Sequence, residues 1–189
     1  AASHLIRLHG ADGGIILSAS HNPGGMDGDF GVKYNIANGG PAPESVTAEI
    51  HAETLRLSGY RISATAAPDL TQEGSHRLDD MLVEVVNPVA DYAALMESRF
   101  DFKAIRAMFA AGFTMKFDAM CAVTGPYAVE ILERRLGAAP GTVMNATPLP
   151  DFGGMHPDPN PTWDADLYGM LMGPDAPDFG AASDGDGDR

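Results

Sequence analysis

The chain has 189 residues, of which 44% are hydrophobic, so it is long and apolar enough to form one large or two smaller domains. Its formal net charge of −14 argues against nucleic acid or an anionic membrane as a partner, because both would be repelled. The single cysteine, Cys121, excludes an internal disulfide framework and fits a cytoplasmic protein, and no apolar run reaches the length of a transmembrane helix.

The first half of the chain alternates short apolar runs with turn residues. Residues 4–9 either end a helix or lead into a strand. Residues 60–80 contain scattered Ser, Thr, Pro, Asp and Gly, which predicts an irregular surface connection. The remaining predicted elements are strands over residues 15–17, 32–36 and 81–86, and a helix that begins at Pro43-Glu44 and ends at Gly59.

The second half predicts a new α/β unit after Asn87-Pro88, which divides the chain into two domains, residues 1–88 and 89–189. The order strand, helix, strand predicts a parallel pair joined by a right-handed crossover. The expected fold class is therefore α/β, with mixed or parallel sheets flanked by helices. The predicted elements are helices around residues 92–96 and 105–109, strands over 113–120, 142–146 and 179–182, and helices over 125–136 and 163–172.

A serine-containing motif follows the strand predicted at residues 15–17. Ser20 lies there on a glycine-rich loop with many free backbone donors, where a nucleophile or a phosphate could be placed. Lys33 provides a positive charge further along the chain, and such a charge could help to activate a nucleophile. A glycine-rich surface loop without chemistry is the alternative interpretation.

An acidic motif ends the chain, where Asp184, Asp186 and Asp188 alternate with glycines. Three carboxylates at this spacing can converge on one hard divalent cation if the backbone curls, which glycine permits. A cation bound in this way keeps open positions that suit a phosphate group. An EF-hand loop does not fit, since the glutamate at the twelfth position is missing. A solvated acidic loop is the alternative.

The order of eight motifs resembles the phosphoglucomutases of the alpha-D-phosphohexomutase superfamily. The paired SASHNP and DGDGDR motifs are highly specific, and NGGPAPE and GGMHPDPNP favour the glucose-phosphate branch. The commonest family pattern has threonine in place of Ser18 and a larger residue in place of Ser183. The motifs are SASHNPGG, GDFGVKYN, NGGPAPE, FDFKAI, DAM, GPYAVEIL, DFGGMHPDPNP and DFGAASDGDGDR.

The resemblance implies two incomplete phosphohexomutase-type α/β domains. Residues 1–88 resemble the C-terminal part of the first domain, which carries the phosphoserine loop. Residues 89–189 resemble the N-terminal part of the second domain and end at the metal-binding loop. Because family members are four-domain chains, the resemblance implies that this chain is a fragment and that it is poorly active alone.

The resemblance also implies an isomerase of the intramolecular phosphotransferase type, which interconverts glucose 1-phosphate and glucose 6-phosphate. The reaction would pass through phosphorylated Ser20 and glucose 1,6-bisphosphate, which would be both intermediate and activator. Lys33 would be general acid or base, and His21 would support the phosphoserine. Sugar phosphates would be the partners, bound by Ser20, Lys33, Asp188 and Arg189. The ligands implied for Mg²⁺ are Asp184, Asp186, Asp188 and an oxygen of phosphorylated Ser20.

Other functions remain open at this point. One is a related phosphohexomutase of different sugar preference, and another is a glucose 1,6-bisphosphate synthase. A third is a non-catalytic family member that acts as a binding protein, although intact Ser20, Lys33 and the three aspartates argue against it.

Overall fold

The computed structural model describes residues 1–189, which divide into two compact units. Unit 1 comprises Ala1–Gly14 and Tyr34–Pro88, and unit 2 comprises Ile15–Lys33 and Val89–Arg189. Residues 15–33 therefore pack with unit 2, although the chain before and after them belongs to unit 1. The division into domains 1–88 and 89–189 stays a prediction, since the two units are defined by contacts and not by continuity of the chain.

Unit 1 contains two helices and a hairpin: α1 (Ala2–His9), α2 (Glu44–Thr54), β3 (Gly74–Leu78) and β4 (Met81–Val85). Residues 4–9 thus lie within a helix, which ends at Gly10 in the left-handed conformation (φ 59°). The prediction of an irregular connection over residues 60–80 is wrong for β3, which pairs antiparallel with β4. Its strand structure depends on that partner, because residues 74–78 carry no strong strand pattern.

Two short strands contribute to both units. β1 (Gly13–Leu17) and β2 (Val32–Ile36) pair in a two-stranded sheet. Both occupy the positions predicted from their apolar runs, β1 with two glycines added at its start. The segment between them is the glycine-rich loop that carries Ser20.

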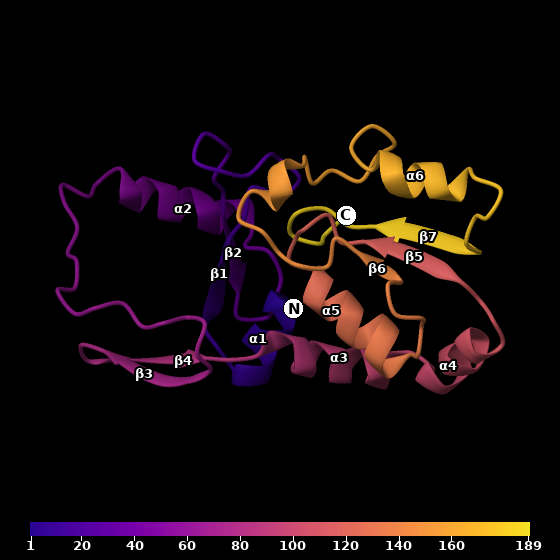
Figure 1. Ribbon diagram of the computed structural model, residues 1–189. Coiled ribbons are helices and arrows are strands. Elements are labelled where there is room, and N and C mark those ends of the chain that lie inside the picture. Colours follow the sequence, from indigo (N-terminus) through magenta and orange to yellow (C-terminus); the bar gives the residue numbers. More distant parts are fainter. The chain divides into compact units, whose positions relative to one another are not determined.

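Unit 2 is built on a three-stranded parallel sheet in the order β6-β5-β7 (Figure 1). The strands are β5 (Met115–Asp118), β6 (Val143–Met144) and β7 (Phe179–Ala182). The predicted parallel pair is confirmed, since Phe117 of β5 is in register with Val143 of β6. β7 also runs parallel to β5, with Asp118 opposite Ala182. The carboxyl ends of the strands therefore meet at one edge, where α/β sheets place ligands.

The helices of unit 2 begin at recognisable signals and cover both faces of this sheet. Asp101 and Asp164 cap α4 and α6 by accepting the N–H groups of Ala104 and Leu167. Leu171 of α6 packs against Gly180, whereas α5 faces the neighbouring β7 residues on the opposite side. The elements are α3 (Pro88–Arg99), α4 (Phe102–Ala110), α5 (Gly125–Ala128), which continues as the π-helix η1 (Val129–Arg135), the 3-10 turn η2 (Phe152–Gly154) and α6 (Ala165–Leu171).

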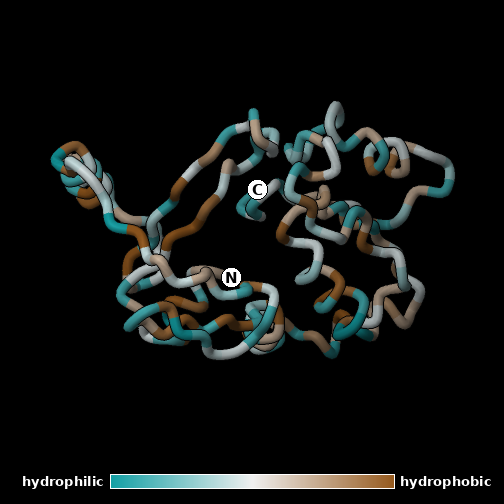
Figure 2. The backbone as a smooth tube through the Cα atoms, turned by 60° about the vertical axis from the view of Figure 1, so that its left-hand side comes forward, coloured by the Kyte–Doolittle hydropathy of each residue, from teal (hydrophilic) through white to brown (hydrophobic).

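The core of unit 2 lies between the sheet and α5, where Ala119, Ala128 and Val143 are buried against Phe117 and Leu132. None of the helices in the chain has the length and apolar character needed to cross a membrane. The hydropathy colouring of Figure 2 turns hydrophilic at the C-terminal end, directly after β7. The sheet thus delivers a polar segment at its carboxyl edge.

Candidate functional site

The aspartate loop, residues 183–189, begins where β7 ends. The Ser183 N–H donates to the Asp118 carbonyl at 3.1 Å and so extends the bonding between β7 and β5 by one residue. The Ser183 hydroxyl also hydrogen bonds with the Thr124 hydroxyl at 2.6 Å. Contacts to two neighbouring segments therefore fix the start of the loop.

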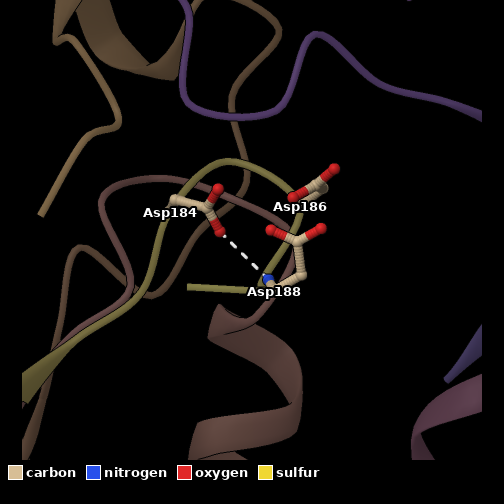
Figure 3. A group of neighbouring side chains, drawn as sticks. All are labelled: Asp184, Asp186 and Asp188. Atoms are coloured by element: carbon tan, nitrogen blue, oxygen red, sulfur yellow. Dashed lines mark hydrogen bonds between the residues drawn. The ribbon is translucent and has the colours of Figure 1, made fainter.

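Asp184 gives the aspartate loop its curl. The residue is fully buried, and its Oδ1 accepts the N–H groups of Gly187, Asp188 and Arg189 at 2.9, 3.1 and 3.3 Å. Figure 3 shows the backbone wrapped around this carboxylate, with the three aspartates on the curled segment. Gly187 has a φ of 76°, which glycine adopts without steric strain. The curl expected from the glycine spacing is therefore present.

Two carboxylate oxygens in this loop are buried without a hydrogen-bond partner, Oδ2 of Asp184 and Oδ1 of Asp186. Burying a charged carboxylate oxygen without a hydrogen bond or a counter-charge costs free energy, so a cation bound to these two atoms would stabilise the loop. Ligand atoms of Asp184, Asp186 and Asp188 all lie within 4.8 Å of one another. An all-oxygen set of this size fits a hard divalent cation such as Mg²⁺.

Lys33 of β2 supplies positive charge to the aspartate loop. Its Nζ donates to Asp186 Oδ2 at 2.5 Å and to Asp188 Oδ2 at 3.2 Å. The hydrogen bond to Asp186 raises the pKa of Lys33 above its usual value, against an opposing effect of burial. Burial acts to raise the pKa of Asp186, but the hydrogen bonds from Lys33 and Ser18 outweigh it and the pKa is lowered. Both groups are therefore held in their charged forms.

The serine loop, residues 18–31, meets the aspartate loop through Ser18 and Ser20. The Ser18 hydroxyl donates to Asp186 Oδ2 at 2.6 Å and accepts the N–H of Ser20 at 2.9 Å. Ser20 has a φ of 58°, a left-handed conformation that is uncommon for a residue with a side chain. A Cβ on Gly185 would overlap the Ser20 carbonyl oxygen, so the two backbones touch directly at this glycine.

Phe152 packs against both loops. A Cβ built on Gly24 of the serine loop would lie 3.0 Å from the edge of the Phe152 ring. A Cβ built on Gly185 of the aspartate loop would lie 3.2 Å from the Phe152 Cζ. Phe152 itself has a φ of 53°, a strained conformation for an aromatic residue. The ring is therefore held in a position where it contacts both loops.

His21 and Arg189 form a second link between the serine and aspartate loops. Nη1 of Arg189 lies 2.6 Å from Nδ1 of His21. Because a guanidinium can only donate, the histidine accepts through Nδ1 and its ring carries the proton on Nε2. The two residues that the resemblance assigns to phosphoserine support and sugar-phosphate binding are thus in direct contact.

Every predicted site residue lies in unit 2, and the serine and aspartate loops are adjacent although they are far apart in the sequence. Lys33 contacts two of the three aspartates through its side chain, whereas Ser20 reaches the loop through its backbone. Sequence reasoning missed Ser18, Thr124 and Phe152 as parts of this arrangement. The sequence signals for Ser18 were its place at the start of the serine motif and the hydroxyl residue that the family pattern has there, but neither indicated its contacts. Thr124 and Phe152 lie outside the serine and aspartate motifs.

Family comparisons match both parts of the chain. The phosphoglucomutase/phosphomannomutase alpha/beta/alpha domain I matches residues 1–61, and alpha/beta/alpha domain II of the same family matches residues 90–189. The second match alone covers more than half of the chain.

Individual relatives agree with the family match. A phosphoglucomutase of Rhizobium radiobacter is 62% identical over the whole chain, which covers 35% of that relative. A chloroplastic phosphoglucomutase of Solanum tuberosum is 51% identical, again over the whole chain, which covers 30% of it. The crystal structure of the Paramecium exocytosis-sensitive phosphoprotein parafusin, a phosphoglucomutase in its open form, superposes with a TM-score of 0.89 at 40% identity. The superposition covers 100% of this chain and 37% of that one.

The chain thus spans about a third of the length of the relatives it matches. The chain matches two successive domains of one family. Its parallel sheet and its adjacent serine and aspartate loops are consistent with these matches. The chain belongs to the phosphoglucomutase/phosphomannomutase family.

Proposed function

We propose that this chain carries the phosphoserine and the cation-binding loop of a phosphoglucomutase, which interconverts glucose 1-phosphate and glucose 6-phosphate. The observation that supports this most strongly is the pairing of the serine loop with an aspartate loop that holds two unpartnered buried carboxylate oxygens. Relatives named phosphoglucomutase, up to 62% identical, support the same reaction.

In the proposed reaction, Ser20 carries a phosphoryl group on its Oγ. A free hydroxyl of glucose 1-phosphate attacks this phosphorus, the bond from phosphorus to Oγ breaks, and glucose 1,6-bisphosphate forms. The other phosphoryl group of the bisphosphate then returns to Ser20 Oγ and leaves glucose 6-phosphate. Positioning and charge neutralisation carry most of the catalysis of such in-line transfers.

The charged residues around Ser20 have distinct proposed roles. Lys33 is the proposed general acid or base for the proton of the sugar hydroxyl. Its ammonium, which lies beside Asp186 and Asp188, has a proton to donate and can accept one only after that proton has left. His21 supports the phosphoserine through the ring edge that does not bond Arg189. Arg189, with Asp188, Ser20 and Lys33, binds the sugar phosphate.

The proposed ligands of Mg²⁺ are Asp184, Asp186, Asp188 and an oxygen of phosphorylated Ser20. Oδ2 of Asp184 and Oδ1 of Asp186 are the atoms available for it, because the second oxygen of each carboxylate is already hydrogen bonded within the protein. A bound Mg²⁺ supplies charge neutralisation and polarises the phosphoryl oxygens during transfer.

Sugar phosphates are the expected partners of the chain. The chain alone is expected to turn over its substrate slowly, because its relatives are about three times as long. A cytoplasmic location also stays a prediction, since the Solanum tuberosum relative is named as chloroplastic.

The experiment is phosphopeptide mass spectrometry on the longest natural polypeptide that contains this chain. Trypsin releases residues 8–33, which include Ser18 and Ser20, so a Ser20→Ala variant identifies the modified hydroxyl. We expect phosphate that leaves Ser20 only when glucose 1-phosphate and Mg²⁺ are both present, while glucose 6-phosphate appears. Mannose 1-phosphate tested in parallel separates a mutase of different sugar preference. A Ser20 that is never phosphorylated, with no product formed, would favour a binding protein.

A further inference from the structure

Ser18 connects the serine loop to the aspartate loop through a single hydroxyl. It gives one hydrogen bond, to Asp186 Oδ2 at 2.6 Å, and receives one, from the Ser20 N–H at 2.9 Å. A hydroxyl has only one proton and a carboxylate can only accept, so the direction of both bonds is fixed. Both bonds are part-buried, and the bond to the Asp186 carboxylate is strengthened by the charge of its acceptor.

We propose that Ser18 is a positioning residue that couples the orientation of Asp186 to the backbone conformation of Ser20. The inference rests on the proposed function, in which Asp186 is a cation ligand and Ser20 carries the phosphoryl group. Ser18 does not touch the phosphoryl group in this account. It acts through the two residues that do the binding and the transfer.

On the Asp186 side, Ser18 decides which carboxylate oxygen stays free. Oδ2 accepts from both Ser18 and Lys33, whereas Oδ1 is buried and unpartnered. Without the Ser18 hydroxyl, only the half-exposed Lys33 side chain would hold Oδ2, and the carboxylate could rotate. Partners that hydrogen bond to ligating carboxylates orient them in this way, and losing one typically weakens metal affinity by about 10- to 100-fold.

On the Ser20 side, Ser18 holds a strained residue in place. A left-handed conformation costs a residue with a side chain about 1–2 kcal/mol, so it needs support from its surroundings. Ser18 accepts the Ser20 N–H, and Gly185 packs against the Ser20 carbonyl on the other side. The Ser20 backbone is therefore held at both ends, which limits the directions that its hydroxyl can take.

Substitutions at position 18 can either keep or remove the hydroxyl, so they test its role directly. Threonine carries the same hydroxyl, whereas alanine has no hydroxyl. Ser18→Thr should therefore preserve the coupling and Ser18→Ala should break it. Ser98→Ala is the matched control, because the Ser98 hydroxyl also makes one hydrogen bond, to the Leu95 carbonyl of α3, away from both loops.

The test measures Mn²⁺ binding by electron paramagnetic resonance in the longest natural polypeptide that contains this chain. We expect about 10-fold weaker Mn²⁺ binding in Ser18→Ala, because Lys33 still holds Asp186, and unchanged binding in Ser18→Thr and Ser98→Ala. If Ser18→Ala does not fold, Ser18→Cys takes its place, since a thiol is a weak donor. Circular dichroism of each variant confirms that the comparison concerns folded protein.

Steady-state kinetics provide the second readout. Loss of positioning should lower kcat for glucose 1-phosphate and leave its KM nearly unchanged, because Ser18 does not contact the sugar. Mn²⁺ binding and kcat of Ser18→Ala equal to those of the unaltered protein would overturn the inference, as would a Ser18→Thr variant that is as impaired as Ser18→Ala. Unaltered protein that binds no Mn²⁺ would instead overturn the proposed function and the inference together.

Discussion

Unit 1 and unit 2 differ in the side chains they bury. In unit 2, Asp118, Asp164 and Asp184 are buried at or near the strand ends, beside an apolar core. In unit 1, Ile6 is the one buried hydrophobic side chain and Asn35 the one buried polar side chain. Burying a carboxylate is costly unless its oxygens find partners. Burying these carboxylates costs unit 2 folding free energy, as is typical of functional sites. The candidate functional residues of the chain are concentrated in this unit.

Unit 1 buries no aspartate or glutamate side chain. Leu55, Leu57, Tyr60 and Ile62 are all exposed, in a stretch without helix or strand between α2 and β3. Substitutions at the carboxyl edge of the sheet in unit 2 should therefore weaken cation binding, whereas substitutions in unit 1 should not. All the substitutions below lie in unit 2, and they run from the largest expected effect to the smallest.

The largest effect is expected from Asp184→Asn. Asparagine keeps an oxygen that can accept the three backbone N–H groups, so the loop should retain its curl, but the variant loses the charge of the buried carboxylate. Mn²⁺ affinity should fall by at least about 100-fold. Losing a residue that only orients a metal ligand already costs about 10- to 100-fold, and Asp184 is a proposed ligand itself. Titration followed by electron paramagnetic resonance measures this. Asp166→Asn, an exposed aspartate of α6, is the control, and equal loss in both variants would contradict the assignment.

Gly185→Ala should be the most damaging change that leaves all charges in place. The added Cβ would overlap the Ser20 carbonyl oxygen and press on the Phe152 ring, so the serine and aspartate loops must separate. We expect a loss of about 2–4 kcal/mol in the free energy of unfolding, measured in urea, together with loss of phosphoryl transfer. Gly169→Ala in α6 meets no atom within 4 Å and should gain about 0.5–1 kcal/mol. Similar losses in both variants would show that the close loop contact is absent.

A moderate effect is expected from Phe152→Leu. Leucine leaves part of the space between Gly24 and Gly185 unfilled, which should cost about 1–2 kcal/mol of stability and lower kcat. Thermal unfolding and steady-state kinetics measure the two effects. Phe100→Leu alters an exposed phenylalanine and should change neither. A Phe152→Leu variant of unchanged stability and kcat would remove Phe152 from the account.

The smallest effect concerns Asp164, the cap of α6. Burial, followed by the nearby charge of Asp118, raises the pKa of Asp164. The folded state therefore holds this proton more tightly than the unfolded state, so the residue's unfavourable contribution at neutral pH disappears as the pH falls through the range just above its usual value. Asp164→Asn keeps a capping oxygen for the Leu167 N–H and should gain up to about 1 kcal/mol at pH 7.

The pH dependence distinguishes this explanation from a simple packing effect. The gain in Asp164→Asn should shrink as the pH falls through the raised pKa of Asp164, where that residue takes up its proton in the unaltered protein. Urea unfolding at several pH values measures the gain. A gain that stays constant across the range would mean that the charge of Asp164 is not its cause.

Much of the fold could be predicted because its signals are local. The apolar runs of β2 and β7 predicted both strands at their observed bounds, and the order strand, helix, strand predicted a parallel pair. Helix ends were less accurate, since α2 ends at Thr54 and not at the Gly59 stop signal. β3 was missed because its strand structure depends on pairing with β4.

The candidate site could be predicted only in part, because motifs identify residues but not their contacts. The glycines between the aspartates indicated a curled loop, and the curl depends on backbone bonds within a few residues. The bond from Ser18 to Asp186 spans 168 residues of sequence, so no local pattern could predict it. Phe152 contacts both loops from a third segment, and its role became visible only from the space that its ring fills.

The most direct test of the central claim asks whether the phosphate on Ser20 and the cation on the aspartate loop share one site. The measurement is ³¹P nuclear magnetic resonance of the Ser20-phosphorylated protein during titration with paramagnetic Mn²⁺, with Asp184→Asn as the control. The account predicts that the phosphoserine resonance broadens beyond detection in the unaltered protein and persists in Asp184→Asn. A resonance that stays sharp while Mn²⁺ binds, or that broadens equally in both proteins, would contradict a single phosphoryl-transfer site.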